Sequence, residues 1–267
     1  MLDRFNRNIH YLRISVTDRC NLRCTYCMPE EGVKLIDKKE ILSLEEIVDV
    51  VKIGSEKFGI RKIRFTGGEP LVRKGIVELV RQISSIKGIE ESTMTTNGIL
   101  LPDFADALKE AGLKRVNISL DTMSPEKFRI ITRGGDLEQV KEGIRAAKSA
   151  GLNPVKINVV KTKILDQEEL AALQDFCREN ELEIRYINQM NLQTGSFSKV
   201  EGGSSGNCAA CNRLRLMSNG NIKPCLFGNQ SFNIRELGIE EAFQLALDRK
   251  PLKGVANDNH QFYNIGG

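Results

Sequence analysis

Apolar positions along the chain recur in short strand-like runs that are separated by longer segments of helical periodicity. The strand-like runs lie at about 10–16, 61–65, 91–96, 114–120, 154–160 and 182–188. Alternating units of this kind build a parallel sheet whose right-handed crossovers are helices. Six such units predict an α/β fold, either an incomplete barrel or an open doubly wound sheet.

Polar side chains occupy every second position in five of these strands, with apolar residues between them. They are Arg13, Ser15, Lys62, Arg64, Asn117, Ser119, Lys156, Asn158, Glu183 and Arg185. A parallel sheet covered by helices on both faces is apolar on both, whereas a barrel that holds a polar ligand alternates in this way. The pattern therefore favours a partial (β/α)6 barrel with a polar interior; a half-exposed sheet is the alternative.

The repeating pattern gives way to a Gly/Ser-rich connector before the end of the chain. We therefore predict two units, a barrel over 1–190 and a connector with a small C-terminal segment over 191–267. The second unit contains strand-like runs near 213–217 and 221–226 and a helical pattern near 238–249.

The composition is that of an ordinary globular protein, with 40% apolar and 28% charged residues among 267. The net charge of +4 is too small to indicate nucleic-acid binding. No run approaches the roughly 18 apolar residues of a membrane span, and the start lacks the apolar core of a signal peptide. We expect a cytoplasmic protein with neither nucleic acid nor membrane as a partner.

Seven cysteines fall into two triads and one single residue, Cys177. In a reducing compartment such clustering indicates metal binding rather than disulfides. Cys177 shares the apolar stripe of a predicted helix with Leu170 and Leu173. We therefore predict that Cys177 is a packing residue and not a ligand.

The first triad, Cys20-x3-Cys24-x2-Cys27, follows the first strand directly. In barrels and α/β sheets the loops after the strands carry the ligand-binding residues. A structural zinc ion or a fully ligated cluster takes four protein ligands, and no fourth cysteine or histidine stands nearby. Three buried thiols are one interpretation; the spacing favours an iron–sulfur cluster with one iron open to a cofactor.

The second triad, Cys208-x2-Cys211-x13-Cys225, also lacks a fourth cysteine. It lies in a segment that is too small to bury much core of its own, and a second cluster would supply that core. A zinc site completed by His260 is the alternative, because structural zinc takes four protein ligands.

The segment TDRCNLRCTYCMPE resembles the radical S-adenosylmethionine superfamily, in which an aromatic residue, here Tyr26, precedes the last cysteine. Later motifs of the superfamily are matched by Gly67, Gly68, Glu69, the turn at 95–98, and Ser119. The resemblance implies that S-adenosylmethionine binds the open iron and is cleaved reductively to a 5′-deoxyadenosyl radical. Glycine in the second motif would let the backbone approach this cofactor closely.

Within the superfamily the chain resembles the GTP 3′,8-cyclase family of molybdenum cofactor biosynthesis over nearly its whole length. The matching stretches are RFTGGEPLVR, LKRVNISLDTMSPEKFRIITRGGDLEQVKEGI, PVKINVV, CNRLRL with CLF, and the terminal glycine pair. The implied GTP contacts are Arg13, Arg64, Thr95, Lys156, Arg185, Arg213 and Arg215. The implied cofactor contacts are Tyr26, Gly68, Ser119 and Met190. The implied catalytic residues are Arg213, Arg215, Gly266 and Gly267.

The same resemblance implies two [4Fe–4S] clusters, the second of which holds the purine of GTP. The implied reaction is abstraction of the ribose 3′ hydrogen, followed by attack of the 3′ carbon on C8 of guanine. The implied partners are a flavodoxin or ferredoxin as reductant, a downstream cyclic pyranopterin monophosphate synthase, and a second copy of the chain in a homodimer. Two rival hypotheses are a radical enzyme acting on a peptide or another nucleotide, and a non-catalytic iron–sulfur electron carrier.

Four of the implied GTP contacts, Arg13, Arg64, Lys156 and Arg185, lie on the polar strand faces. Several cations that converge in a barrel interior are costly unless an anion accompanies them. A triphosphate is such an anion, and arginine binds it through paired hydrogen bonds. Both routes of reasoning therefore predict a basic cavity.

The connector departs from the family pattern. Between Met190 and Cys208 the family carries some tens more residues, including a helix and strands that support the second unit. Here a Gly/Ser-rich stretch replaces them. The departure puts the closure of the cavity and the orientation of the second cluster in question.

Overall fold

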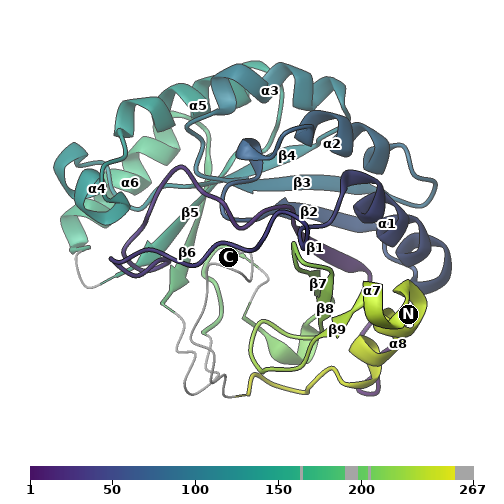
Figure 1. Ribbon diagram of the computed structural model, residues 1–267. Helices are drawn as coiled ribbons and strands as arrows, with labels where there is room; N and C mark the ends of the chain where they lie inside the picture. The colour runs from purple at the N-terminus through teal and green to yellow at the C-terminus, as the bar shows by residue number, and fades with distance from the viewer. Residues whose placement is uncertain (163–164, 190–197, 204–205, 256–267) are drawn as a thin grey trace.

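The structure is a computed structural model that describes residues 1–162, 165–189, 198–203 and 206–255. Its strands form one sheet in the order β6-β5-β4-β3-β2-β1-β7-β8-β9 (Figure 1). The first six strands are Tyr11–Ser15 (β1), Lys62–Thr66 (β2), Glu91–Thr96 (β3), Arg115–Ser119 (β4), Lys156–Lys161 (β5) and Glu183–Asn188 (β6). These strands pair in parallel and in chain order, as the sequence predicts.

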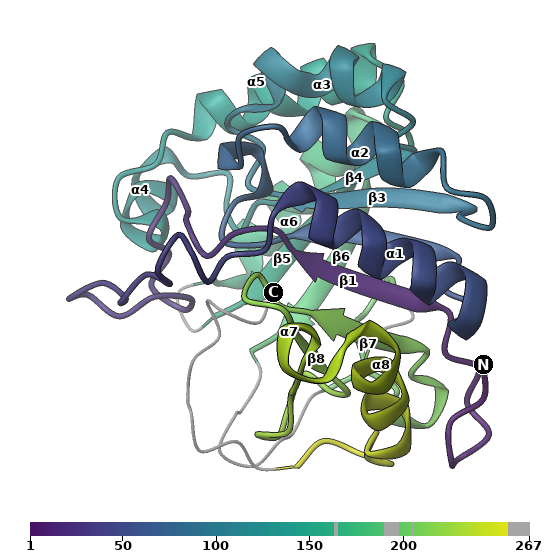
Figure 2. The same cartoon turned by 45° about the vertical axis from the view of Figure 1, so that its right-hand side comes forward.

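The helices that connect these strands pack on the outer side of the curved sheet (Figures 1 and 2). They are Leu44–Phe58 (α1), Ile76–Ser84 (α2), Leu101–Glu110 (α3), Pro125–Thr132 (α4), Leu137–Ser149 (α5) and Gln167–Glu179 (α6), with a short 3-10 helix at Pro70–Val72 (η1). Helices outside a parallel, chain-ordered sheet define a partial barrel, so the predicted fold class is confirmed. None of the described helices is both long and apolar enough to cross a bilayer.

Local sequence sets where these helices begin and end. At the start of α1 the Ser43 side chain accepts from the N–H of Glu46, while the Glu46 carboxylate accepts from the N–H of Ser43. Gly59 ends the helix in the left-handed region with φ 64°, a conformation that glycine adopts without a side-chain penalty. The helix is therefore fixed at both ends before it packs on the sheet.

The alternation along the strands separates the core from the barrel interior. Leu12 and Ile14 of β1 and Phe65 of β2 are each 0% exposed and belong to the core between the sheet and the helices. Burying each such side chain contributes about 2 kcal/mol. The intervening polar residues, such as Arg13 and Arg64, lie on the opposite face and line a cavity, as predicted.

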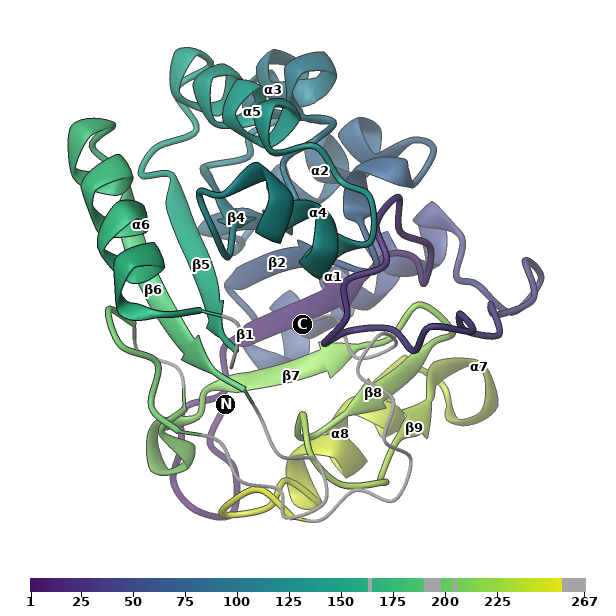
Figure 3. The same cartoon turned by 90° about the vertical axis from the view of Figure 1, so that its left-hand side faces the viewer.

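The C-terminal segment extends the barrel sheet. Its elements are Cys208–Ala210 (η2), Arg213–Leu216 (β7), Asn221–Lys223 (β8), Phe232–Asn233 (β9), Ile234–Leu237 (α7) and Ile239–Asp248 (α8). The predicted runs near 213–217 and 221–226 and the helix near 238–249 are confirmed. Strand β7 pairs in parallel with β1, and β8 and β9 follow in antiparallel (Figure 3). The division of the chain at residue 190 stays a prediction.

Helix α8 also packs on the first half of the chain. The rings of Phe58 in α1 and Phe243 in α8 stack with centroids 4.9 Å apart, and such pairs add stability beyond their buried area. At Gly54 of α1 a Cβ atom would lie only 3.0 Å from the Phe243 ring. The C-terminal segment is thus held both by sheet pairing and by helix packing.

Cys177 lies in the barrel core as the sequence predicts. It is 2% exposed on α6 and belongs to the same core as Leu173. Burial raises the pKa of its thiol to about 11, so the side chain is a neutral, apolar packing group at physiological pH.

Cys177→Ser should lower the free energy of unfolding by about 1–3 kcal/mol, because it places a hydroxyl in an apolar site. Urea denaturation of the iron-free protein measures this loss. Iron content after anaerobic reconstitution should not change. A lower iron content in Cys177→Ser would contradict the assignment of Cys177 to packing.

Candidate functional site

The first cysteine triad lies in the loop that leaves the carboxyl end of β1. The N–H groups of Cys27 and Met28 both donate to the carbonyl of Cys24, at 2.9 and 3.0 Å, and close a tight turn. The N–H of Leu22 points at Cys20 Sγ from 3.3 Å. This N–H donor favours an anionic sulfur, but burial outweighs it and raises the pKa of the Cys20 thiol.

Residues at the end of α4 anchor this loop to the barrel. The Arg133 guanidinium donates through Nη1 to the carbonyls of Arg23 and Met28, at 3.0 and 2.8 Å. The N–H of Thr25 donates to the carbonyl of Ile131 at 2.9 Å. The cysteine loop is therefore held by backbone contacts on both sides of the triad.

The glycine pair after β2 packs directly against the cysteine loop. A Cβ atom at Gly68 would lie 2.2 Å from the carbonyl oxygen of Arg19, and one at Gly67 would lie 2.7 Å from that of Thr17. The N–H of Gly68 donates to Thr17 at 2.8 Å, and the N–H of Glu69 donates to Arg19 at 2.8 Å. Glycine is required here because two loops touch; the approach of this backbone to a cofactor stays a prediction.

Glu69 is a buried carboxylate that joins the ends of β2 and β3. Its Oε1 accepts from Thr96 Oγ1 at 2.8 Å and from the N–H of Leu71 at 3.0 Å, and its Oε2 accepts from the N–H of Asn97 at 2.7 Å. Burial raises its pKa to about 7, although these hydrogen bonds favour the charged form. These contacts give Glu69 a scaffolding role, and its predicted contact with a cofactor stays a prediction.

Tyr26 is fixed at the edge of the barrel interior by Asp121. The Tyr26 hydroxyl donates to Asp121 Oδ2 at 2.8 Å, and the N–H of Val160 donates to Asp121 Oδ1 at 2.7 Å. Burial raises the pKa of Asp121 to about 6. This chain of contacts ties the cysteine loop to β4 and β5.

The electrostatics of the first triad suit a metal cluster. Burial raises the pKa of Cys24 to about 12 and that of Cys27 to about 11, and repulsion between neighbouring thiolates acts in the same direction. Bound iron would lower these pKa values again, because a metal stabilises the thiolate form. No group of three or more described His, Cys, Asp or Glu side chains is arranged to hold a single metal ion.

A cavity of about 210 Å³ lies inside the barrel. It brings together eight of the residues predicted from the sequence, which are Arg13, Tyr26, Arg64, Thr95, Ser119, Arg185, Arg213 and Arg215. Cys27 reaches the same cavity from the first triad, and Leu226 reaches it from the C-terminal segment. Asn117 and Asn158 also line it. The sequence places these two on the polar strand faces but gives them no role.

Three arginines stand side by side in this cavity. Arg64, Arg13 and Arg215 occupy neighbouring register positions on β2, β1 and β7. Burial, with repulsion from Arg215, lowers the pKa of Arg13 well below its ordinary value. Burial, with repulsion from Arg213, lowers the pKa of Arg215 to about 10. The centroid of the Tyr11 ring lies 5.6 Å from Arg64 Cζ and 5.4 Å from Arg213 Cζ. Cation–π attraction to this ring offsets part of the free-energy cost of burying these two guanidinium groups.

Other polar atoms in the cavity lack partners. Within the described ranges Thr95 Oγ1, Asn117 Nδ2 and Arg185 Nε are buried and make no hydrogen bond. A buried polar atom left unpaired costs about 1–3 kcal/mol. All three residues line the cavity, so a polar ligand that hydrogen-bonds to them would recover this cost.

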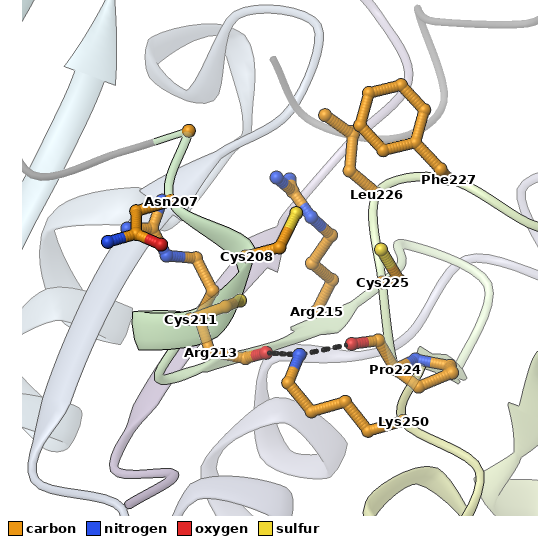
Figure 4. Close-up of a pocket in the computed structure, with 11 residues that line it drawn as sticks. Asn207, Cys208, Cys211, Arg213, Arg215, Pro224, Cys225, Leu226, Phe227 and Lys250 are labelled. Carbon is orange, nitrogen blue, oxygen red and sulfur yellow. Dashed lines mark hydrogen bonds between the residues drawn. The ribbon is translucent and has the colours of Figure 1, made fainter. Parts of the chain in front are cut away.

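The second triad lines a smaller cavity of about 60 Å³ (Figure 4). Cys211 precedes β7 and Cys225 follows β8, and antiparallel pairing of these strands brings both to one end of the hairpin. Cys208 reaches the cavity from η2. Arg213 and Arg215 line both cavities, so the second triad adjoins the arginine row.

Lys250 is a residue of this second cavity that sequence reasoning missed. It is 1% exposed, and it lies just after α8, where a lysine in the sequence looks like a solvated helix end. Burial acts to raise the pKa of Cys211, but Lys250 and Arg213 together bring it below its ordinary value. No sequence signal identifies Lys250, because its burial depends on packing against distant strands.

Some predicted residues lie elsewhere. Lys156 is not among the residues that line the cavity and forms an ion pair with Glu183 on the neighbouring strand. Its predicted contact with a nucleotide therefore requires this pair to open. Met190, His260, Gly266 and Gly267 lie outside the described residues, so their roles stay predictions.

The pattern of the Radical SAM superfamily matches residues 14–177. A GTP 3′,8-cyclase from Alkaliphilus oremlandii is 42% identical over 100% of this chain and 98% of its own length. A protein of the same name from Pelotomaculum thermopropionicum is 40% identical over the whole of both chains. The first match extends over 315 residues, compared with 267 in this chain, so that relative carries tens of residues that this chain lacks.

Solved structures share the fold at low identity. Streptococcus suis SuiB bound to S-adenosylmethionine matches with a TM-score of 0.69 at 18% identity, over 93% of this chain and 66% of that one. The enzyme anSMEcpe with bound AdoMet matches with a TM-score of 0.64 at 18% identity, over 88% of this chain and 80% of that one. The chain belongs to the radical S-adenosylmethionine superfamily and, within it, to the family of the GTP 3′,8-cyclases.

Proposed function

We propose that this protein is a GTP 3′,8-cyclase that performs the first step of molybdenum cofactor biosynthesis. The observation that carries the proposal is the arginine row of Arg64, Arg13 and Arg215, which faces a cavity bordered by Cys27 of the first triad. The cavity of the second triad adjoins the same row. A polyanionic substrate held between two cysteine triads fits this arrangement, and the names of the relatives agree with it.

Membership of the superfamily implies one [4Fe–4S] cluster and S-adenosylmethionine. We propose that Cys20, Cys24 and Cys27 are the ligands of this cluster. A second [4Fe–4S] cluster on Cys208, Cys211 and Cys225 is part of our proposal. When bound, the first cluster supplies the electron that cleaves S-adenosylmethionine to a hydrogen-abstracting radical, and the second supplies an open iron for the purine. In the proposed reaction the ribose 3′ hydrogen would pass to the 5′-deoxyadenosyl carbon and the 3′ carbon would bond to C8. One electron from the external reductant and one proton from solvent would then quench the radical left on the purine.

The residues of the chain bind and orient the substrate. Arg13 and Arg64 would pair with the triphosphate, and Arg185 and Thr95 would satisfy their free donors on it. Lys156 would join them after leaving Glu183. Enclosure by the barrel keeps water away from the radical and strengthens each of these charge interactions.

Cofactor and catalytic roles follow the family pattern residue by residue. We assign cofactor contacts to Tyr26, Gly67, Gly68, Glu69, Ser119 and Met190. We assign catalytic contacts with the substrate to Arg213, Arg215, Gly266 and Gly267. The cavity lining supports Tyr26, Ser119 and the two arginines, since all four reach the same space.

The proposed chemistry also sets the partners. A one-electron carrier such as a flavodoxin or ferredoxin would reduce the first cluster, and a cyclic pyranopterin monophosphate synthase would consume the product. A homodimer is our expected assembly. Six cysteines that serve as metal ligands require a reducing compartment, so we propose that the protein works in the cytoplasm.

The reaction itself provides the first test. The reconstituted enzyme is incubated without oxygen with S-adenosylmethionine, reductant, and GTP, ATP or buffer alone. We expect 5′-deoxyadenosine together with a cyclised nucleotide for GTP only. Cofactor cleavage without a GTP-derived product would favour a related radical enzyme with another substrate. Absence of cofactor cleavage would favour an electron carrier.

Gly68→Ala should prevent loading of the first cluster. The new methyl group would collide with the Arg19 carbonyl, which is backbone and cannot move without displacing the cysteine loop. Iron should fall from about eight to about four per chain, as measured by a colorimetric iron assay. Gly203→Ala is the control, because its Cβ would meet a Val200 side chain at 3.2 Å. Normal iron in Gly68→Ala would refute this packing argument.

Cys225→Ala should also lower iron from about eight to about four per chain, because it removes one of three ligands of the second cluster. Formation of 5′-deoxyadenosine should persist in part while the nucleotide product disappears. Chromatography of the reaction mixture measures both compounds, and Cys177→Ala is the control that keeps all the iron. Unchanged iron in Cys225→Ala would remove the second cluster from the proposal.

Arg64→Ala should weaken GTP binding about tenfold or more, because a charge-assisted hydrogen bond contributes about 1.5–3 kcal/mol. Guanosine should bind far more weakly than GTP to wild type and should respond little to Arg64→Ala. Anaerobic calorimetry gives both affinities. Lys62→Ala is the matched control: it removes the same charge from the same strand face, but Lys62 pairs with Glu91 outside the cavity. Equal affinity for GTP and guanosine would contradict recognition of the phosphates.

A further inference from the structure

Lys250 is a buried cation at the second cysteine triad. Its Nζ donates to the carbonyl of Arg213 at 2.7 Å and to that of Pro224 at 2.6 Å (Figure 4). Arg213 follows Cys211 by two residues, and Pro224 immediately precedes Cys225. One ammonium group therefore joins the two backbone segments that carry these cysteines.

The charge of Lys250 has no carboxylate partner among the described residues. The ion pairs of the described ranges do not include Lys250. Arg7, Arg213 and Arg215 are cations in its surroundings, and the ionisable groups that favour its charge are the thiols of Cys211 and Cys225. A buried ammonium in such surroundings is costly unless an anion lies beside it. The cavity that Lys250 lines contains the three cysteines of the second triad and no acidic side chain. Thiolates, or a cluster held by them, are the anions that fit.

Arg7 lies in the same region and also binds backbone carbonyls, but unlike Lys250 it has a carboxylate partner. Its Nη1 donates to the carbonyl of Cys208 at 2.9 Å, and its Nη2 donates to that of Pro251 at 2.8 Å. Its charge is balanced by Asp3, whose Oδ2 lies 2.6 Å away. Arg7 thus links the third cysteine segment to the residue after Lys250, but it brings no net charge. The uncompensated charge belongs to Lys250.

We propose that Lys250 is a positioning residue of the second cluster: it holds the Cys211 and Cys225 segments together and supplies the positive charge that offsets the negative charge of the cluster. The inference rests on the proposed second cluster. Because a nearby cation stabilises the reduced, more negative form, Lys250 should raise the reduction potential of that cluster. It touches neither substrate nor cofactor in this assignment and acts only through the cluster.

The test uses the full chain with Cys20, Cys24 and Cys27 all changed to alanine, so that the second cluster is the only one left to load. In this parent, Lys250→Met removes the positive charge and the N–H donors of the ammonium group, while the side chain keeps nearly the same length. Lys250→Arg retains the charge. Lys253→Met is the matched control, because Lys253 is exposed and lies three residues further along the same segment. Iron per chain and the midpoint potential, followed by electron paramagnetic resonance, are measured for all four proteins.

Lys250→Met should lower the ratio of reduced to oxidised cluster at a fixed potential about tenfold or more, which is 59 mV for a one-electron couple. Lys250→Arg should restore part of this ratio, and Lys253→Met should leave it unchanged. Loss of second-cluster iron in Lys250→Met, with normal loading of the first cluster in the full-cysteine chain, would support the same role by showing that the segments have separated.

Two results would overturn the assignment of Lys250. One is a Lys250→Met protein with the potential and iron of its parent. The other is a Lys250→Met chain that also fails to load the first cluster, because its defect would then be global and not local to the second triad. A parent that binds no iron at all would instead refute the proposed second cluster itself, so failure of the two proposals can be told apart.

Discussion

The row of arginines across β2, β1 and β7 is the constraint on which the rest of the structure depends. Parallel pairing sets Arg64, Arg13 and Arg215 at neighbouring register positions, on strands that lie about 4.8 Å apart. Like charges opposite one another destabilise a sheet, and burial in the barrel adds a desolvation cost. The free-energy cost of placing these arginines side by side is smaller when an anionic ligand binds among them, so the row favours binding of a polyanion.

Apolar packing between the strands and the outer helices offsets the free-energy cost of burying these arginines. Apolar residues alternate with the arginines on the same strands and pack against helices that are capped by their own sequence. The cysteine loop gains its order from neighbouring turns: Gly68 touches it through the backbone, Arg133 binds its carbonyls, and Glu69 fixes the next turn along. The cysteine loop is thus positioned by contacts from three different βα units.

Much of this arrangement could be predicted from the sequence, because it depends on short-range pattern. Period-two alternation identified the inner strand faces, and the spacing of the first triad predicted a cysteine loop after β1, whose role in holding a cluster stays a prediction. The rest depends on pairings between distant residues. Nothing in the sequence indicates that β7 adds to β1, that Lys156 meets Glu183, or that Lys250 turns into the core. The sequence analysis singled out Gly67 and Gly68 because glycine would let the backbone approach a cofactor. In the structure both glycines are required because they contact the cysteine loop.

Strand direction explains how the two cysteine triads come to lie on either side of the arginine row. The first triad follows the carboxyl end of β1, whereas Cys211 precedes the amino end of β7, which runs parallel to β1. The triads therefore lie beyond opposite ends of these two strands, and the five residues of β1 between them span roughly 16 Å. Arg13 and Arg215 occupy the middle of that span. In the proposed function, a substrate whose phosphates bind these arginines would lie between the two triads. The parallel addition of β7 to the barrel edge thus brings the cavity of the second triad next to the cavity inside the barrel, because Arg213 and Arg215 line both.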